Sequence, residues 1–220
     1  MIDAQTLLDT FHFRHACKSF DPGRKIDAAD FDLILETGRL SPASFGYEPW
    51  RFLVIQNPDL REKLKAVTWG AQTHLPTASH FLVILSRRAA DMRFDSPWLD
   101  QLMRTGMGFD DTRVAQRVAR FKTFQEQDFH LLDDDRYLFE WSCRQCYIAL
   151  GNMMTAAALR GIDSCAIEGY DQALAEAVLN DAGLTENGRF GIAVMCAFGY
   201  RIKPQTPKTR QPLTDIVRWA

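Results

Sequence analysis

Disulfide-forming pairs are missing from this sequence. The five cysteines stand at positions 17, 143, 146, 165 and 196, an odd and unclustered set among 220 residues. Domains that depend on disulfides carry an even number of cysteines at close, regular spacings. Free thiols in a reducing compartment are the better interpretation, and we expect a cytoplasmic protein.

Net charge and a leader segment are also lacking. Lys and Arg number 26 and Asp and Glu number 28, so the formal net charge is only −2. Non-specific binding to nucleic acid or anionic membranes needs a cationic excess, so we expect neither partner. No secretion signal is expected, because Asp3 and Asp9 interrupt the segment that would have to be apolar. With 46% hydrophobic and 25% charged residues, the composition is typical of one α-rich globular domain, or two at most.

Motifs of several enzyme classes are absent as well. We find no serine–histidine–acid spacing, no P-loop and no carboxylate pair at helical i, i+4 spacing that would face a cleft. Gly106-Met107-Gly108 resembles the start of a dinucleotide fingerprint, but it follows no predicted strand and lacks the third glycine. Cys143 and Cys146 form a C-x-x-C pattern inside a predicted helix without a second pair. A zinc site needs four ligands and a redox pair favours a helix N-terminus, so buried core cysteines are the simpler interpretation and no metal site is expected.

The most informative stretch that is present runs from residue 135 to residue 170. Between Cys146 and Leu159 only Asn152 and Thr155 are polar, so a helix here is apolar almost all the way round. Helix-forming residues dominate it and Gly161 stands where a helix would end, which predicts a helix of roughly two dozen residues with a glycine C-cap. Its apolar part is too short for a membrane span, which needs about 20 apolar residues.

Complete burial of such a helix is unusual in a single chain of 220 residues. Ala149, Gly151 and the three alanines at 156–158 would let another backbone approach closely. We therefore expect a second copy of the chain to cover part of the helix in a two-fold dimer. The alternative is a central helix in the core of a monomer.

The rest of the chain alternates between amphipathic helices and short apolar strands. Helices are predicted at residues 3–13, 27–39, 58–67 and 171–179, and strands at residues 51–56, 80–86, 164–167 and 189–200. Residues 91–132 are predicted to form two or three surface helices, as a lid or excursion. The tail, residues 201–220, is extended and ends in apolar residues, so we expect it to dock on the partner copy.

Cationic side chains are grouped near both ends of the chain, as Arg14, His15 and Lys18 and as Lys208 and Arg210. Cations at a helix end are commonly solvated and hold no ligand. A phosphorylated, flat, redox-active ligand would use such cations for its phosphate, and the aromatic, serine-containing loop of residues 41–50 for its ring. Composition and spacing leave both interpretations open.

Five segments, taken together and in order, carry a resemblance to a known family. They are RHACKSFD (residues 14–21), LSPASFGYEPWRF (40–52), TASHFLVIL (77–85), QCYIALGNMMTAAALRGIDSCAIEGYD (145–171) and FGYRIKPQTPKTRQPL (198–213). With them the chain resembles the FMN-dependent nitroreductase family, and is most similar to the bacterial oxygen-insensitive NAD(P)H nitroreductases. The resemblance implies one domain of residues 1–220 with an α+β fold, in which helices flank a mixed sheet and residues 91–132 lie over the active site. It also implies an intertwined homodimer built on the central helix, with two FMN sites between the subunits.

The resemblance further implies which residues hold FMN. Arg14, His15, Ala16 and Lys18 match the first flavin motif, with Arg14 on the phosphate, and Lys208 and Arg210 match a second phosphate contact. Ser41, Pro42, Ala43 and Ser44 match a loop that comes over the flavin from the other subunit. Ile167, Glu168 and Gly169 match an I-E-G segment whose main chain meets the ring near N5.

The chain also departs from the family pattern. Many relatives have an asparagine and a lysine before the second strand, facing the pyrimidine edge of the flavin, where this chain has WGAQTHLPTASH. We assign that contact to Gln72, with His74 as the other candidate. Ala166 stands where many relatives have proline, and Glu48 replaces a glutamine. Phe124 is the candidate gate over the open flavin face, and packing in the core or the dimer is the alternative role for it.

The activity that the resemblance implies is the transfer of two electrons from NAD(P)H, through FMN, to a nitroaromatic, a quinone or a similar small-molecule acceptor. NAD(P)H and the acceptor would use the same flavin face in turn, in a ping-pong mechanism, and no side chain need act as acid or base. Reductive dehalogenation or other flavin chemistry of the same superfamily is an alternative. A flavin-binding protein with little turnover is another.

Overall fold

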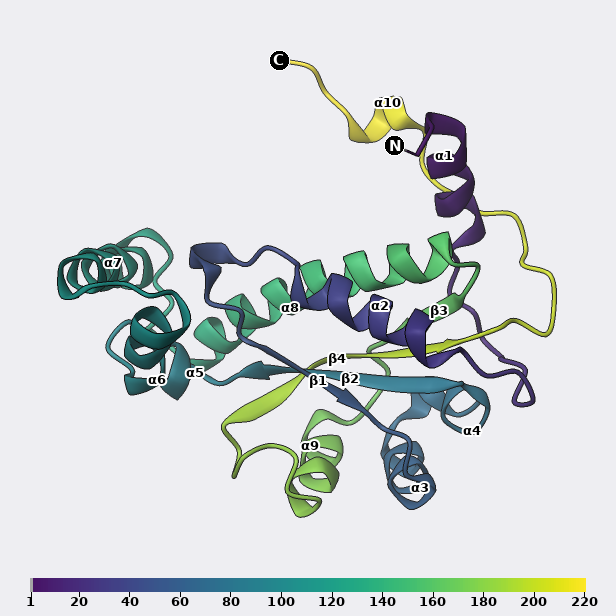
Figure 1. Cartoon of the computed structure of the whole chain (residues 1–220), viewed down its shortest axis with the longest axis horizontal. Coiled ribbons are helices and arrows are strands. Elements are labelled where there is room, and N and C mark those ends of the chain that lie inside the picture. The colour runs from purple at the N-terminus through teal and green to yellow at the C-terminus, as the bar shows by residue number, and fades with distance from the viewer. Residues whose placement is uncertain (1) are drawn as a thin grey trace.

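Four β-strands form the central sheet of the chain, which the computed structural model describes from residue 2 to residue 220 (Figure 1). They are β1 (Trp50–Val54), β2 (His80–Arg87), β3 (Asp163–Ile167) and β4 (Phe190–Gly199), in the spatial order β1-β2-β4-β3. The ladders between them are antiparallel. The two central strands, β2 and β4, are buried over almost their whole length, as near-continuous apolar runs predict.

Parallel pairing contributes little to this sheet. Within residues 2–220 it is limited to one isolated bridge between Ala16 and Ser164, which places the segment after the first helix along the free edge of β3. The predicted α+β class is confirmed. The resemblance implies a sheet with both parallel and antiparallel pairing. Within residues 2–220 the Ala16–Ser164 bridge is the parallel contact of this sheet.

Helices cover both faces of the sheet. Figure 1 shows α2 (Ala28–Arg39) and α8 (Asp135–Leu159) on one face, and α3 (Pro58–Val67), α4 (His74–Thr77) and α9 (Gln172–Asp181) on the other. Successive side chains of a strand point to opposite faces. Leu82 and Ile84 of β2 accordingly pack in the cluster with α2 and α8, whereas Phe81, Val83 and Leu85 pack in the cluster with α3, α4 and α9.

The central helix α8 begins and ends where the sequence predicts. The Asp134 side chain accepts a hydrogen bond from the main chain of Arg136 at its start, and Gly161 follows its end with a φ of 69°. One side of α8 packs on the sheet through Cys146 and Met153, which are buried. All five cysteines are buried and free, so the prediction of core cysteines is confirmed.

Burial of α8 on every side is not achieved within one chain. Tyr147 and Ile148 are 38% and 41% exposed, and nothing lies within 4 Å of a Cβ built on Gly151. Cover of this face by a second copy stays a prediction. Among residues 2–220 no helix has the length and apolar character needed to cross a bilayer.

The flanking helices lie close to their predicted positions. The bounds of α3 are those predicted, because Asn57 caps its start by accepting from the main chain of Leu60 and Pro58 takes the first helical position. Asp27 is the N-cap residue of α2, as predicted, and Asp3 is the cap residue of α1 (Ala4–Phe13) rather than its first helical residue. The Asp27 side chain makes no capping hydrogen bond.

The excursion between β2 and α8 consists of short helices, as predicted. They are α5 (Ala89–Met92), α6 (Pro97–Gln101) and α7 (Asp111–Thr123), with π-helical turns η3 (Leu102–Gly106) and η4 (Phe124–Asp128). Phe121 and Trp141 pack there with Tyr47, from the loop after α2, and burial raises the pKa of Tyr47 to about 12. The aromatic loop is therefore docked on its own chain.

Candidate functional site

Arg14, Lys208 and Arg210 come together at one cavity, although they belong to opposite ends of the chain. The cavity has a volume of about 670 Å³, and Leu8 and Phe11 of α1 form its apolar side. Within residues 2–220 none of the three cations forms an ion pair with a carboxylate. Burial, and then the charges of Arg14 and Arg210, lower the pKa of Lys208. Uncompensated cations around one cavity are what an anion-binding site requires.

The tail reaches this cavity because it is held on the last turn of α1. Main-chain carbonyls of α1 accept hydrogen bonds from it: Phe11 from Lys208, His12 from Gln205 at 2.8 Å, and Phe13 from Arg201 at 3.1 Å. An α-helix leaves these C-terminal carbonyls unpaired, so the tail completes the helix end. Sequence reasoning missed Arg201 and Gln205, because a donor to a main-chain carbonyl belongs to no motif.

Beyond residue 210 the tail makes little contact with its own chain. In Figure 1 the short helix α10 (Leu213–Ile216) is drawn to the left of the upper end of α1, and both termini of the chain are on this side of the molecule. Leu213 and Trp219 are 70% and 93% exposed. Docking of this last part on a partner copy stays a prediction.

His15, Ala16 and Lys18 line a second, smaller cavity of about 220 Å³ together with residues 201–206. Gln205 borders both cavities, so the two are neighbours. Burial, and then the charge of Arg201, lower the pKa of His15, which keeps its imidazole neutral near pH 7. The structure thus brings the two predicted cationic groups to adjoining cavities.

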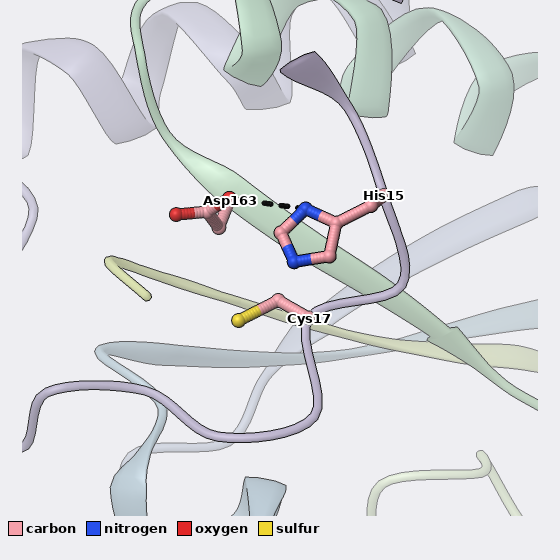
Figure 2. A group of neighbouring side chains, drawn as sticks. All are labelled: His15, Cys17 and Asp163. Carbon is pink, nitrogen blue, oxygen red and sulfur yellow. Dashed lines mark ion pairs between the residues drawn. The ribbon is translucent and has the colours of Figure 1, made fainter. Parts of the chain in front are cut away.

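Figure 2 shows His15 with Cys17 and Asp163, a group whose ligand atoms lie close enough to hold a metal ion. His15 Nδ1 is 3.6 Å from Asp163 Oδ1. The carboxylate of Asp163, however, already accepts from the guanidinium and the main chain of Arg201, each at 2.8 Å, and burial raises the pKa of the Cys17 thiol. A fixed cation and a protonated thiol both oppose metal binding, so the group does not fit a metal. Asp163 instead holds Arg201, which donates to the Phe13 carbonyl, whereas His15 Nδ1 makes no hydrogen bond within residues 2–220.

The predicted I-E-G segment forms a turn directly after β3. The Gly169 carbonyl accepts a hydrogen bond from the Gly70 N–H at 2.6 Å, and the Glu168 carbonyl accepts from the Tyr170 N–H at 3.0 Å. Gly169 is buried, yet its own N–H donates to no acceptor within residues 2–220. Buried main-chain donors without a partner are rare, so a ligand acceptor is expected there.

The two candidates for the flavin edge contact, Gln72 and His74, lie on the segment that packs against this turn. Gln72 Nε2 donates to the carbonyls of Lys65 and Thr68, at 2.7 and 2.9 Å, and thereby caps the end of α3. His74 is buried, with Nε2 3.0 Å from the Cys17 carbonyl. Gln72 Oε1 and the buried His74 Nδ1, which has no hydrogen-bond partner within residues 2–220, are the atoms left for a ligand in this conformation, and the edge contact stays a prediction for both.

The loop of Ser41, Pro42, Ala43 and Ser44 is held by α8. Asn152 Nδ2 donates to Ser41 Oγ at 2.8 Å, and the Ser44 N–H donates to Gln145 Oε1 at 2.9 Å. At 100° per residue, positions 145 and 152 share one side of the helix, whereas Tyr147, which contacts Glu168, lies about 200° round from position 145. Within one chain the loop and the I-E-G turn are therefore on opposite sides of α8.

Phe124 opens the π-helical turn η4 and packs among aromatic rings. Its ring centroid lies 5.2 Å from that of Phe45, 4.5 Å from Phe129 and 5.7 Å from Trp141. It also borders a cavity of about 380 Å³ beside α7. Packing therefore explains part of its burial, and its role as a gate stays a prediction.

Comparison with known proteins agrees with this geometry. A family model described as "Nitroreductase family" matches residues 12–200. The chain belongs to the nitroreductase family. It is 50% identical over 220 residues, all of both chains, to a Bacillus subtilis protein named provisionally as NAD(P)H nitroreductase YfkO. It is also 50% identical over 216 residues to a provisionally named NAD(P)H nitroreductase of Staphylococcus epidermidis, covering 98% of this chain and 97% of that one.

Solved nitroreductase structures share the fold. A nitroreductase-like protein from Streptococcus mutans has a TM-score of 0.78 at 18% identity, over 99% of this chain and 100% of that one. A provisionally named nitroreductase from Exiguobacterium sibiricum, solved in complex with FMN, has a TM-score of 0.73 at 21% identity, over 100% of this chain and 98% of that one. Identities this low show the fold alone.

One copy of this nitroreductase-family chain assembles only part of the predicted FMN site. The first motif runs beside β3, since Ala16 bridges Ser164 and Lys18 Nζ lies 3.9 Å from Cys165 Sγ. The I-E-G turn follows at the end of the same strand. The Ser41–Ser44 loop is on the other side of α8 and does not join them.

Proposed function

We propose that this member of the nitroreductase family is an FMN-dependent oxidoreductase that acts as a homodimer. It would take two electrons from NAD(P)H and pass them to a nitroaromatic, a quinone or a similar small acceptor in a ping-pong sequence. The names of its relatives support the NAD(P)H-dependent oxidoreductase part of this proposal.

The observation that carries the proposal is the cavity bordered by Arg14, Lys208 and Arg210. Cations repel one another, and no carboxylate of residues 2–220 pairs with any of these three. A phosphate monoester would satisfy them through charge-assisted hydrogen bonds, with the arginines able to bind in two-pronged fashion. Leu8 and Phe11 form an apolar wall of the same cavity. In the proposal, the phosphate of the ligand contacts the cations, and a less polar part of the ligand lies against this wall.

The unpaired N–H of Gly169 supports a ring acceptor at the other end of β3. This donor is main chain, so it can hold a ring nitrogen without adding a charge that titrates near pH 7. In the proposal, the Ser41–Ser44 loop of the partner copy covers the ring, because the chain's own loop lies across α8 from the I-E-G turn. Two copies would therefore be needed for each site.

FMN, when bound, would supply the redox chemistry, accepting hydride at N5 from NAD(P)H and passing two electrons to the acceptor. The chain's residues would hold and orient it: the cations anchor its phosphate and the Gly169 N–H fixes the ring. No acidic or basic side chain is assigned to the chemical step. The protein's contribution is positioning, which can supply much of the rate enhancement.

Anaerobic titration of the purified protein tests the proposal. A yellow protein should bleach with NADH or NADPH and recover its colour when a quinone or a nitroaromatic is added. Colour without bleaching would indicate a flavin-binding protein with little turnover. Bleaching followed by turnover of a halogenated aromatic alone would indicate reductive dehalogenation, and a colourless monomer that takes up no FMN would end the proposal.

A further inference from the structure

The side chain of Tyr147 reaches from α8 to the I-E-G turn. Its hydroxyl donates a hydrogen bond to Glu168 Oε1 at 2.5 Å, between residues 21 positions apart. Within residues 2–220 this is the one hydrogen bond that the Glu168 carboxylate accepts, and no Lys or Arg forms an ion pair with it. An exposed carboxylate is thus held by a phenol from a rigid helix, although solvent is available to it.

On the side that faces α8, the main chain of Glu168 and Gly169 is not held by the sheet. The ladder between β3 and β4 ends at Ile167, paired with Met195, so Glu168 and Gly169 lie outside the sheet. Gly70 holds them from the other side through its hydrogen bond to the Gly169 carbonyl. The Tyr147 bond is the tie between the turn and α8, the helix that packs on the opposite face of the sheet from α3 and α9.

The phenol is suited to a permanent donor role. Burial, and then its bond to Glu168, raise the pKa of Tyr147 above its ordinary value, so the hydroxyl keeps its proton near neutral pH. A hydrogen bond from a neutral donor to a carboxylate is among the stronger hydrogen bonds of proteins. It also draws the negative charge of Glu168 toward α8.

We propose that Tyr147 is a positioning residue: by holding the Glu168 side chain it fixes the Glu168–Gly169 peptide, and so aims the Gly169 N–H at the ring of the bound flavin. The inference rests on the proposed function, because the ring is the acceptor for that N–H. Tyr147 itself touches no reacting atom in this account. It acts through Glu168, which supplies the main chain.

Four single variants and the Tyr147→Phe/Glu168→Ala double variant test the inference on FMN-loaded dimer. Tyr147→Phe and Glu168→Ala both remove the bond, whereas Glu168→Gln keeps an oxygen that can accept it. Tyr137→Phe is the matched control, because Tyr137 is an exposed tyrosine of the same helix that makes no side-chain hydrogen bond within residues 2–220. The measurements are amide hydrogen exchange of residues 168–170 and the rate of flavin reduction by NADH in anaerobic stopped flow.

In Tyr147→Phe and in Glu168→Ala, amide hydrogen exchange at the turn should become roughly tenfold faster, and flavin reduction roughly tenfold slower. A small misplacement of a group that contacts the reacting ring can lower the rate by one to two orders of magnitude. The double variant should be no worse than either single variant, because both changes remove one bond. Tyr137→Phe should stay within about twofold of wild type, and Glu168→Gln should lose less than Glu168→Ala, because its amide oxygen still accepts from Tyr147, although more weakly than a carboxylate. Exchange in β2 and β4 should not change, which separates positioning from loss of stability.

A yellow Tyr147→Phe dimer with wild-type exchange and reduction would overturn the inference while leaving the proposed function intact. Additive losses in the double variant would also overturn it. A wild-type protein that holds no FMN would overturn the proposed function, and this inference with it.

Discussion

Arg14, Lys208 and Arg210 show how charges that are unfavourable by themselves can define a site. Each lies near like charges, which together with burial lower the pKa of Lys208, and none has a carboxylate partner within residues 2–220. Such an arrangement gains stability when an anion arrives. The family resemblance implied that these residues converge on one phosphate, whereas composition and spacing alone did not, because their convergence depends on hydrogen bonds from the tail to α1.

Replacing Arg14 or Arg210 by alanine should weaken FMN binding by about 10- to 100-fold, because a hydrogen bond to a charged group contributes about 1.5–3 kcal/mol. Titration of the apoprotein by quenching of flavin fluorescence gives the dissociation constants. Lys63→Ala is the matched control, because Lys63 is exposed, forms no ion pair within residues 2–220 and carries the same charge. If both arginine variants bind as tightly as this control, the phosphate assignment is wrong.

At the scale of elements, the I-E-G turn and the segment before α4 approach each other without side chains between them. A Cβ added to Gly169 would lie 2.8 Å from the Gly70 Cα and 2.9 Å from Trp69 Cζ3, and a Cβ added to Gly70 would lie 2.9 Å from the Gly169 Cα. Because the obstacle is largely backbone, rotation of a side chain cannot relieve it. Glycine is needed at both positions for close approach rather than for an unusual φ, since neither has a positive φ.

Gly169→Ala should therefore push the two segments apart and cost about 1–3 kcal/mol of folding free energy, which is a melting temperature lower by about 2–4 °C for each kcal/mol. It should also weaken the hold on the flavin ring, because it displaces the Gly169 N–H. Thermal melts and the visible flavin spectrum check the two effects. Ala166→Ser, at an exposed position of β3, is the control. A variant with the melting temperature and spectrum of wild type would contradict this packing.

At the scale of the whole molecule, α8 divides the chain into parts that cannot form one site alone. Its buried side packs on the sheet, and its exposed side carries Tyr147, Ile148 and Gly151. Apolar surface of this kind on a central helix is typical of an interface. In the proposed dimer, the partner packs on this side and its Ser41–Ser44 loop covers the I-E-G turn of the first chain.

The Gly151→Ala variant tests whether the chain is a monomer or a dimer that packs on this side of α8. In an isolated chain the added Cβ meets nothing within 4 Å, so the helix should gain up to about 1 kcal/mol from the better helix former. If a partner backbone packs there, overpacking costs about 1–3 kcal/mol instead and raises the dimer dissociation constant by roughly tenfold or more. Sedimentation equilibrium measures that constant. A more stable protein with an unchanged constant would mean that the dimer does not use this face at Gly151.

Prediction from the sequence succeeded where local rules decide the structure. Asn57 and Pro58 define the start of α3, and Gly161 marks the end of α8, because caps act over one helical turn. It decides less where a side chain can choose between partners. Gln72 is an example: its amide nitrogen caps α3, a contact that no motif predicts, and its flavin-edge contact stays a prediction.

The sequence by itself determined the class of fold, the central helix and the buried strands, because apolar periodicity and capping residues act between near neighbours in the chain. It also contained the motifs of the nitroreductase family, in order and over nearly the whole chain. Only the tertiary structure decided that hydrogen bonds from the tail to α1 bring Lys208 to Arg14, that Gly70 meets Gly169 and that Tyr147 holds Glu168. These pairs are far apart in sequence, and they meet because helices and strands pack in one register, which no local spacing encodes.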